Sequence, residues 1–144
     1  MKKKVLIILA SIVGVIIAYS LMWFLNNQIV FNKYEKGFED IGINKTKSIK
    51  EYTLSVKKSD YGSFTGNLAI TNEDGSLTII IWPSLFGMEN GIMINEDNNT
   101  YQIMVKKNFD VLDETDEYGK QLIEKYREDL SKMKEIANDE WNIY

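Results

Sequence analysis

The stretch VLIILASIVGVIIAYSLMWFL, residues 5–25, is a run of 21 residues without a charged side chain. As a helix rising ~1.5 Å per residue it would be roughly 31 Å long, which matches the ~30 Å hydrocarbon core of a bilayer. A helix inside a soluble domain is rarely apolar on every face. The segment therefore predicts a membrane-spanning helix, with Tyr19 and Trp23 in the aromatic belt at its C-terminal end.

Basic residues flank this apolar run unevenly. Lys2, Lys3 and Lys4 precede it, and only Lys33 and Lys36 follow it closely. Lysine and arginine are enriched on the cytoplasmic side of membrane-spanning helices. We therefore expect a single-pass signal anchor at residues 1–25, with the N-terminus in the cytoplasm and the C-terminal domain outside the cell membrane.

A cleavable signal peptide is the alternative interpretation of the same segment. Ala18 and Ser20 are small residues at the two positions that signal peptidase reads, and cleavage after Ser20 would release a secreted soluble protein. The released chain would begin Leu-Met-Trp-Phe-Leu and expose an apolar end to water. The length of the apolar run therefore favours the uncleaved anchor.

The composition excludes several kinds of chemistry. The chain has no cysteine and no histidine, which removes disulfides, thiolate nucleophiles, Cys-ligated metal centres and the commonest general base. Beyond the apolar run it carries 14 basic and 21 acidic side chains, a formal charge of 14 − 21 = −7. That charge disfavours nucleic-acid binding. The abundance of Lys, Asn and Ile is typical of bacterial proteins from AT-rich genomes.

The residues after the apolar run carry a helical pattern. Val30, Tyr34, Phe38 and Ile41 recur at spacings of four, four and three, which is typical of one face of a helix. Gly42 is a natural stop for that helix. We therefore expect residues 26–48 to form a juxtamembrane helix, extending to about residue 40, and a linker.

Residues 49–144 have the pattern of a small α+β domain. Apolar and polar residues alternate over several segments, which predicts an antiparallel meander of about five strands. The segments centre on residues 52–56, 64–70, 77–82, 92–94 and 101–105. The third is apolar on both faces through Ile80 and Trp82, so we expect it to be central and covered, and to end at Pro83.

The C-terminal region predicts an amphipathic helix that packs on the meander. Its apolar residues step by three or four and form one stripe. The stripe consists of Tyr118, Leu122, Tyr126, Leu130, Met133, Ala137 and Trp141. The predicted architecture is thus an N-terminal transmembrane helix, an antiparallel sheet and a closing helix.

Acidic residues are the remaining source of candidate chemistry. The run from Asp110 to Glu117 lacks the ligand spacing of an EF-hand, so negative charge at a helix N-terminus is the preferred interpretation. Paired carboxylates could hydrolyse envelope glycans, but no grouping of nucleophile, base and orienting residue is legible. We expect no catalytic activity, metal or cofactor, and a carboxylate-dependent hydrolase is the alternative.

One segment is a candidate partner contact. Residues 82–88 bring the apolar side chains of Trp82, Leu85, Phe86 and Met88 into a predicted loop, and the stretch from residue 84 to 90 is predicted to be irregular. Exposed residues of these types bind partners, whereas packing back onto the sheet is the plainer interpretation. With the anchor, this predicts a non-catalytic, extracytoplasmic interaction module of the cell envelope that binds a protein or envelope component.

Overall fold

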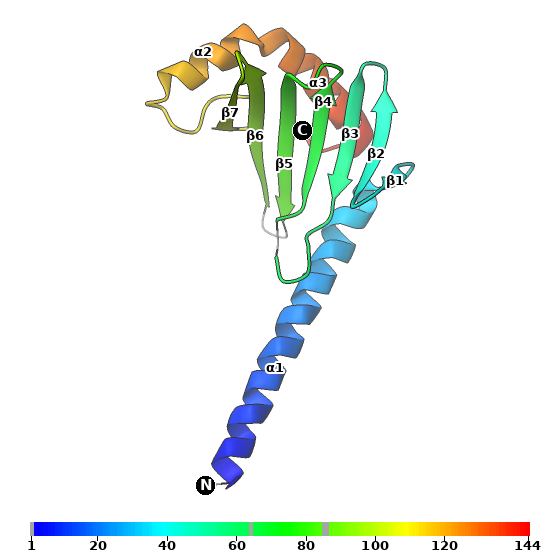
Figure 1. Cartoon of the computed structure of the whole chain (residues 1–144), viewed down its shortest axis with the longest axis vertical. Coiled ribbons are helices and arrows are strands. Elements are labelled where there is room, and N and C mark those ends of the chain that lie inside the picture. Colours follow the sequence, from blue (N-terminus) through cyan, green and yellow to red (C-terminus); the bar gives the residue numbers. More distant parts are fainter. Residues whose placement is uncertain (1, 64, 85–86) are drawn as a thin grey trace.

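A computed structural model describes residues 2–63, 65–84 and 87–144, which form a long N-terminal helix, a seven-stranded antiparallel sheet and two C-terminal helices (Figure 1). The helices are α1 (Lys2–Asn26), α2 (Glu117–Lys125) and α3 (Arg127–Trp141). The strands are β1 (Glu39–Ile41), β2 (Asn44–Ile49), β3 (Tyr52–Lys57), β4 (Asn67–Asn72), β5 (Leu77–Ser84), β6 (Gly87–Glu96) and β7 (Asn99–Val105). The predicted α+β class is confirmed, with seven strands where the sequence predicted about five.

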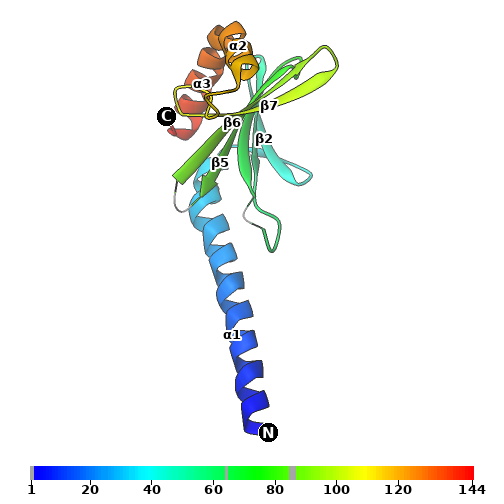
Figure 2. The ribbon, with the colours of Figure 1, turned by 90° about the vertical axis from the view of Figure 1, so that its left-hand side faces the viewer.

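The helix α1 projects from one end of the sheet as a straight rod (Figures 1 and 2). Its large apolar side chains between Val5 and Leu25, Trp23 apart, are 42–69% exposed. Within the part of the chain that the structure describes, it is the one helix long and apolar enough to cross a membrane. The N-terminal apolar helix predicted from the sequence is therefore confirmed.

The segment that follows α1 differs from its prediction. The chain passes through a π-helical turn (Asn27–Phe31) and a 3₁₀ turn (Asn32–Tyr34), where Val30, Phe31 and Tyr34 are buried. The predicted helix to about residue 40 was wrong beyond Tyr34, and the predicted linker was wrong because β1 and β2 occupy most of it. These outermost strands are mostly polar and exposed or half-buried, so they lack the alternation that marks a core strand.

The register aligns apolar residues of neighbouring strands in rows across the sheet. One row consists of Leu54, Ile70, Ile79, Ile92 and Ile103, one residue from each of β3 to β7. Each of these side chains is at most 5% exposed. Because side chains alternate between the two faces of a strand, this row and those two residues away form what we call the core face of the sheet.

The helices α2 and α3 lie on the core face, beside the turns that follow α1 (Figure 2). The sheet edge is joined to α3 by an ion pair between Lys47 of β2 and Glu140, with Nζ and Oε1 2.7 Å apart. Nearby, the ring of Trp141 stacks on Phe38 with the ring centroids 6.1 Å apart. None of the described helices lies on the opposite face of the sheet.

The C-terminal helix predicted over residues 118–141 is two helices. Tyr126, with φ −104° and ψ 11°, separates α2 from α3. The buried stripe continues across this break, but Tyr118 at its predicted start is 52% exposed. The Tyr118 ring instead meets Tyr101 of β7 in an edge-to-face contact, with centroids 5.3 Å apart.

The segment from residue 84 to 90, predicted to be irregular, belongs largely to a β-hairpin. β5 continues through Pro83, and β6 begins at Gly87. Pro83 pairs with Met88 of β6 and lies beyond Ile81, the last residue of β5 that pairs with β4. The strand β4 therefore does not need the N–H that proline lacks, and the prediction that Pro83 ends the strand was wrong.

Candidate interaction surface

The structure divides the predicted contact residues between the two faces of the sheet. Pro83 pairs with Met88, so Met88 lies on the core face, where it packs against the buried cluster. Trp82 lies on the opposite face. Leu85 and Phe86 are outside the described residues. Trp82 and Met88 therefore do not belong to one contact surface.

The face that carries Trp82 has its own rows of aligned residues, and we call it the open face. The first row consists of Ser55, Ala69, Ile80, Gly91 and Met104, and the second of Thr53, Thr71, Thr78, Met93 and Gln102. All of these side chains, and Trp82, are uncharged, although the chain beyond the apolar run has a formal charge of −7. These two rows are thus a neutral area within an acidic domain, and Glu89, which pairs with Trp82, is a charged residue at their margin.

Trp82 and Gly91 fit together on the open face. A Cβ atom at position 91 would fall 2.8 Å from Cζ3 and 2.9 Å from Cη2 of the Trp82 ring. It would also lie 3.5 Å from Sδ of Met104. Glycine therefore leaves the space that the indole occupies, and the thioether lies beside it. Trp82 is half-buried by this packing, whereas Met104 is 41% exposed.

The apolar members of the open face are suited to recognising another protein. Ile80 and Met93 lie on the same face of the sheet as Trp82, and Met104 lies beside its indole. Tryptophan is enriched among residues that dominate interface energies, and methionine adapts its shape to a partner. Exposed groups of apolar side chains that are bounded by polar ones mark interaction sites. We therefore take the open face as the candidate interaction surface.

Sequence reasoning missed most of this surface. Ile80 and Trp82 were recognised as making their strand apolar on both faces, but this was interpreted as burial on both sides. The strand is central as predicted, yet Ile80 is only half-buried because no described helix covers it. The sequence showed a strand that is apolar on both faces and a following strand that contains glycine. This pattern does not distinguish a face covered by helices from an open one.

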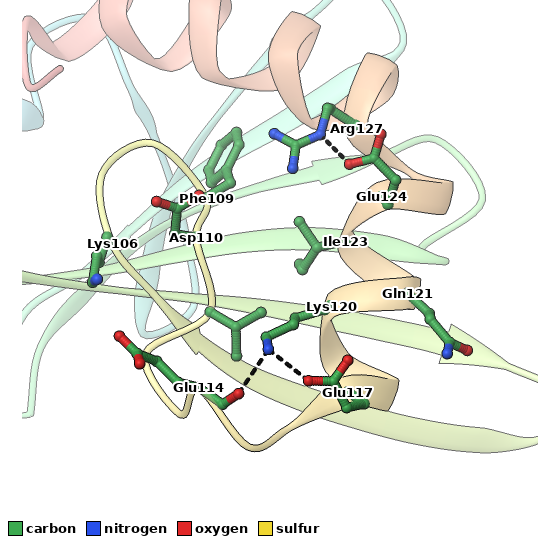
Figure 3. A pocket seen from close by; sticks show the side chains of 11 residues that line it. Lys106, Phe109, Asp110, Glu114, Glu117, Lys120, Gln121, Ile123, Glu124 and Arg127 are labelled. Carbon is green, nitrogen blue, oxygen red and sulfur yellow. Dashed lines mark hydrogen bonds and ion pairs between the residues drawn. The ribbon is translucent and has the colours of Figure 1, made fainter.

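A hollow of about 520 Å³ lies between α2 and the segment joining β7 to α2 (Figure 3). Two of its cations, Lys120 and Arg127, are bonded to neighbouring groups. Lys120 donates to the Glu114 carbonyl oxygen at 2.6 Å and to the Glu117 carboxylate at 2.7 Å, and the Arg127 Nε donates to Glu124 at 2.5 Å. The hollow therefore presents paired charges rather than a pair of carboxylates facing each other across a cleft.

Two acidic residues near the start of α2 also bond to groups close to them in the chain. Asp116 is the N-cap of α2, where its Oδ1 accepts from the Gly119 N–H at 2.7 Å. Asp113 accepts from the N–H and hydroxyl of Thr115 at 2.9 and 2.7 Å. Across residues 2–63, 65–84 and 87–144, no group of three or more acidic residues is arranged to hold a metal ion. The interpretation as helix-terminal charge accounts for Asp116.

Four carboxyl groups have a displaced pKa, and in each the pKa lies below its ordinary value. The largest cause in every case is a hydrogen bond from a neighbouring side chain. The pairs are Asp74 with Ser76, Glu96 with Lys125, Asp113 with Thr115 and Glu128 with Lys132. A general acid in glycoside hydrolysis needs a raised pKa, so none of these four groups suits that role.

Comparison with known proteins adds no relative to this description. No protein-family model matches the chain, and no curated protein and no solved structure matches it. The argument for function therefore rests on α1 and the open face.

Proposed function

We propose that this protein is a membrane-anchored interaction module of the cell envelope, without catalytic activity, that binds a protein partner outside the membrane. The observation that carries the proposal is the combination, in one chain, of an exposed apolar helix and an uncovered sheet face whose two central rows are uncharged. The helix α1 would hold the open face close to the membrane, where a partner in or on that membrane meets it.

The chemistry of the open face favours a protein as the partner. Phosphate groups of nucleic acids are held mainly by Lys and Arg, and the two rows of the open face contain neither. An uncovered surface with a tryptophan and two methionines instead complements apolar side chains of another protein. Lys120 and Arg127 of the hollow beside α2 are already paired with Glu117 and Glu124, which also favours binding over catalysis.

Cysteine labelling tests the anchor and its orientation, because the chain has no native cysteine. Two positions form a matched pair. Glu73 is exposed in the turn between β4 and β5, and Lys3 lies at the N-terminal end of α1. In intact cells, a membrane-impermeant maleimide should label Glu73→Cys in the membrane fraction at full-length mass. Lys3→Cys should be labelled only after the membrane is permeabilised.

Two other results would contradict parts of this proposal. Labelling of Lys3→Cys but not Glu73→Cys in intact cells would place the domain in the cytoplasm. A labelled Glu73→Cys product in the medium, shortened to begin at Leu21, would establish the secreted soluble protein released after Ser20.

Site-specific photocrosslinking tests the open face. A photoreactive residue at Met104, exposed on this face, should form a discrete adduct in native membranes, and the same residue at Ser131, exposed on α3, should not. Ile80→Lys should abolish the Met104 adduct, because Ile80 belongs to the same row. An adduct that persists in Ile80→Lys, or one that also forms from Ser131, would argue against the open face as the binding surface.

A further inference from the structure

The loop between β3 and β4 runs down beside α1, past the end of the sheet (Figure 1). Its upper part is held by Asn27 and Ser59, both buried, through a hydrogen bond from the Ser59 N–H to the Asn27 Oδ1 at 3.1 Å. The hydroxyl of Ser59 accepts from the Gly66 N–H at 2.9 Å, which closes the base of the loop. The loop is therefore fixed to the domain at one end and reaches α1 at the other.

The lower part of this loop bonds to the apolar run itself. Trp23 donates from Nε1 to the Asp60 carbonyl oxygen at 2.9 Å, and Tyr19 donates from its hydroxyl to the Gly62 carbonyl oxygen at 2.7 Å. The ring of Tyr61 meets that of Trp23 edge to face, with centroids 5.1 Å apart. Positions 19, 23 and 27 share one face of the helix, so the loop follows α1 for about 12 Å.

These contacts are made by residues inside the apolar run of α1, so the domain cannot lie far from the bilayer surface. Polar backbone that is exposed to lipid does not occur inside the hydrocarbon core, so the core has to end near Tyr19. From Val5 to Ala18 the helix is only about 21 Å long at ~1.5 Å per residue, against a hydrocarbon thickness of ~30 Å. The part of α1 that the loop does not contact is therefore shorter than the hydrocarbon core, and this mismatch favours a position of the loop close to the membrane.

We propose that the loop of residues 58–63 lies in the lipid headgroup layer of the bilayer that α1 spans, with Tyr61 as its interfacial residue. This inference rests on the proposed membrane anchor. Tyr61 is 70% exposed, and its hydroxyl lies 2.9 Å from that of Ser20. Tyrosine is favoured at the interface because its ring is apolar and its hydroxyl polar. Lys57, the last residue of β3, and Lys58 are already ion-paired with Asp60 and Glu35, so the seating rests on the aromatic residues and not on contacts between lysine and lipid phosphate.

The consequence for function is a fixed orientation of the open face. The strands run roughly along the direction of α1 (Figure 1), so a domain seated by this loop presents the open face sideways, at a set height above the membrane. A partner then has to approach within the plane of the membrane. This deepens the proposed function by selecting a membrane-bound protein as the partner.

Depth-dependent quenching tests the seating in the full-length chain. Three single-cysteine variants, Ser63→Cys in the loop, Glu73→Cys at the far end of the sheet and Val15→Cys in α1, are labelled with an environment-sensitive fluorophore. Each is reconstituted into vesicles of phosphatidylcholine and phosphatidylglycerol in equal parts, containing lipids spin-labelled on the headgroup or in the acyl chain. The Ser63→Cys variant retains Tyr61. If the melting temperature of Ser63→Cys falls below that of the unmodified chain, Thr65→Cys is used as the loop variant in its place.

We expect the headgroup quencher to reduce the fluorescence of the loop probe several times more than that of the Glu73→Cys probe. The acyl-chain quencher should act on Val15→Cys. A loop probe that behaves like Glu73→Cys while Val15→Cys is quenched would overturn the seating and leave the anchor intact. If Val15→Cys is not quenched either, the membrane anchor fails, and the inference fails with it.

Discussion

The two faces of the sheet are built from the same strands, at positions one residue apart, and they follow different rules. On the core face, the row through Ile79 is aliphatic on each strand from β3 to β7 and at most 5% exposed. On the open face, the row through Ile80 runs from serine and alanine to glycine and methionine. Burial by helices accounts for the first row, and it does not account for the large apolar residues of the second.

This difference separates residues that stabilise the fold from residues available for binding. A core side chain touches neighbours on all sides, so its loss leaves a cavity. A side chain on the open face touches only its neighbours in the sheet, so its loss removes less contact. Ile79 and Ile80, adjacent in β5, are the most direct pair for testing this distinction because they are chemically identical.

The largest effect should come from Ile79→Ala. Ile79 is fully buried, and truncating a buried isoleucine to alanine lowers the free energy of unfolding by about 2–5 kcal/mol. The matched change Ile80→Ala should cost about 1 kcal/mol, because Ile80 is half-buried and loses mainly β-propensity and partial burial. Urea unfolding of the full-length chain in detergent micelles measures both. Equal losses at the two positions would show that something covers the open face.

An intermediate effect should come from Gly91→Ala on the open face. The new methyl group would lie within 3 Å of the Trp82 ring, so the indole has to move, and we expect a loss of about 1–2 kcal/mol. In a Trp82→Ala background the same change should be neutral or stabilising, since alanine is less costly than glycine in a strand. A double-mutant cycle by urea unfolding gives the coupling. Additive effects would show that the ring does not rest on Gly91 in solution.

The sequence predicted the core face far better than the open face, for a physical reason. Alternation with period two requires only that one side of a strand be buried, and β3 and β7 carry it clearly through residues such as Leu54 and Ile103. The outer strands β1 and β2 were missed because their stability comes from backbone pairing and from the Lys47–Glu140 ion pair. Neither leaves an apolar period in the sequence.

The candidate site was only partly predictable. Trp82 was identified from its residue type, but placing it relative to Met88 required the hairpin register, because a shift by one residue exchanges the faces. The contacts of Tyr19 and Trp23 with residues 60–62 join segments about forty positions apart. A single sequence carries no pattern for such a pairing, so the seating of the loop could be inferred only from the structure.

The smallest effect should come from the charged margin of the core face. Glu96 ends β6 on the side of α2, where its carboxylate accepts from Lys125 and from the Tyr126 hydroxyl, the latter at 3.1 Å. The hydrogen bond from Lys125 is the main reason that the pKa of Glu96 lies below its ordinary value of 4.5, and desolvation opposes it. The pair therefore stabilises the fold above pH 4.5, and this contribution is lost as the pH falls through the lowered pKa.

Lys125→Met should raise the pKa of Glu96, which carboxyl NMR titration measures directly. The control is Lys132→Met, which removes the partner of Glu128 on the solvent side of α3 and should raise the pKa of Glu128 while leaving that of Glu96 unchanged. Because Lys125 and Lys132 are exposed, both variants should unfold at nearly the urea concentration of the unmodified chain. A pKa of Glu96 that does not respond to Lys125→Met would mean that α2 is not held against the end of β6 by this pair.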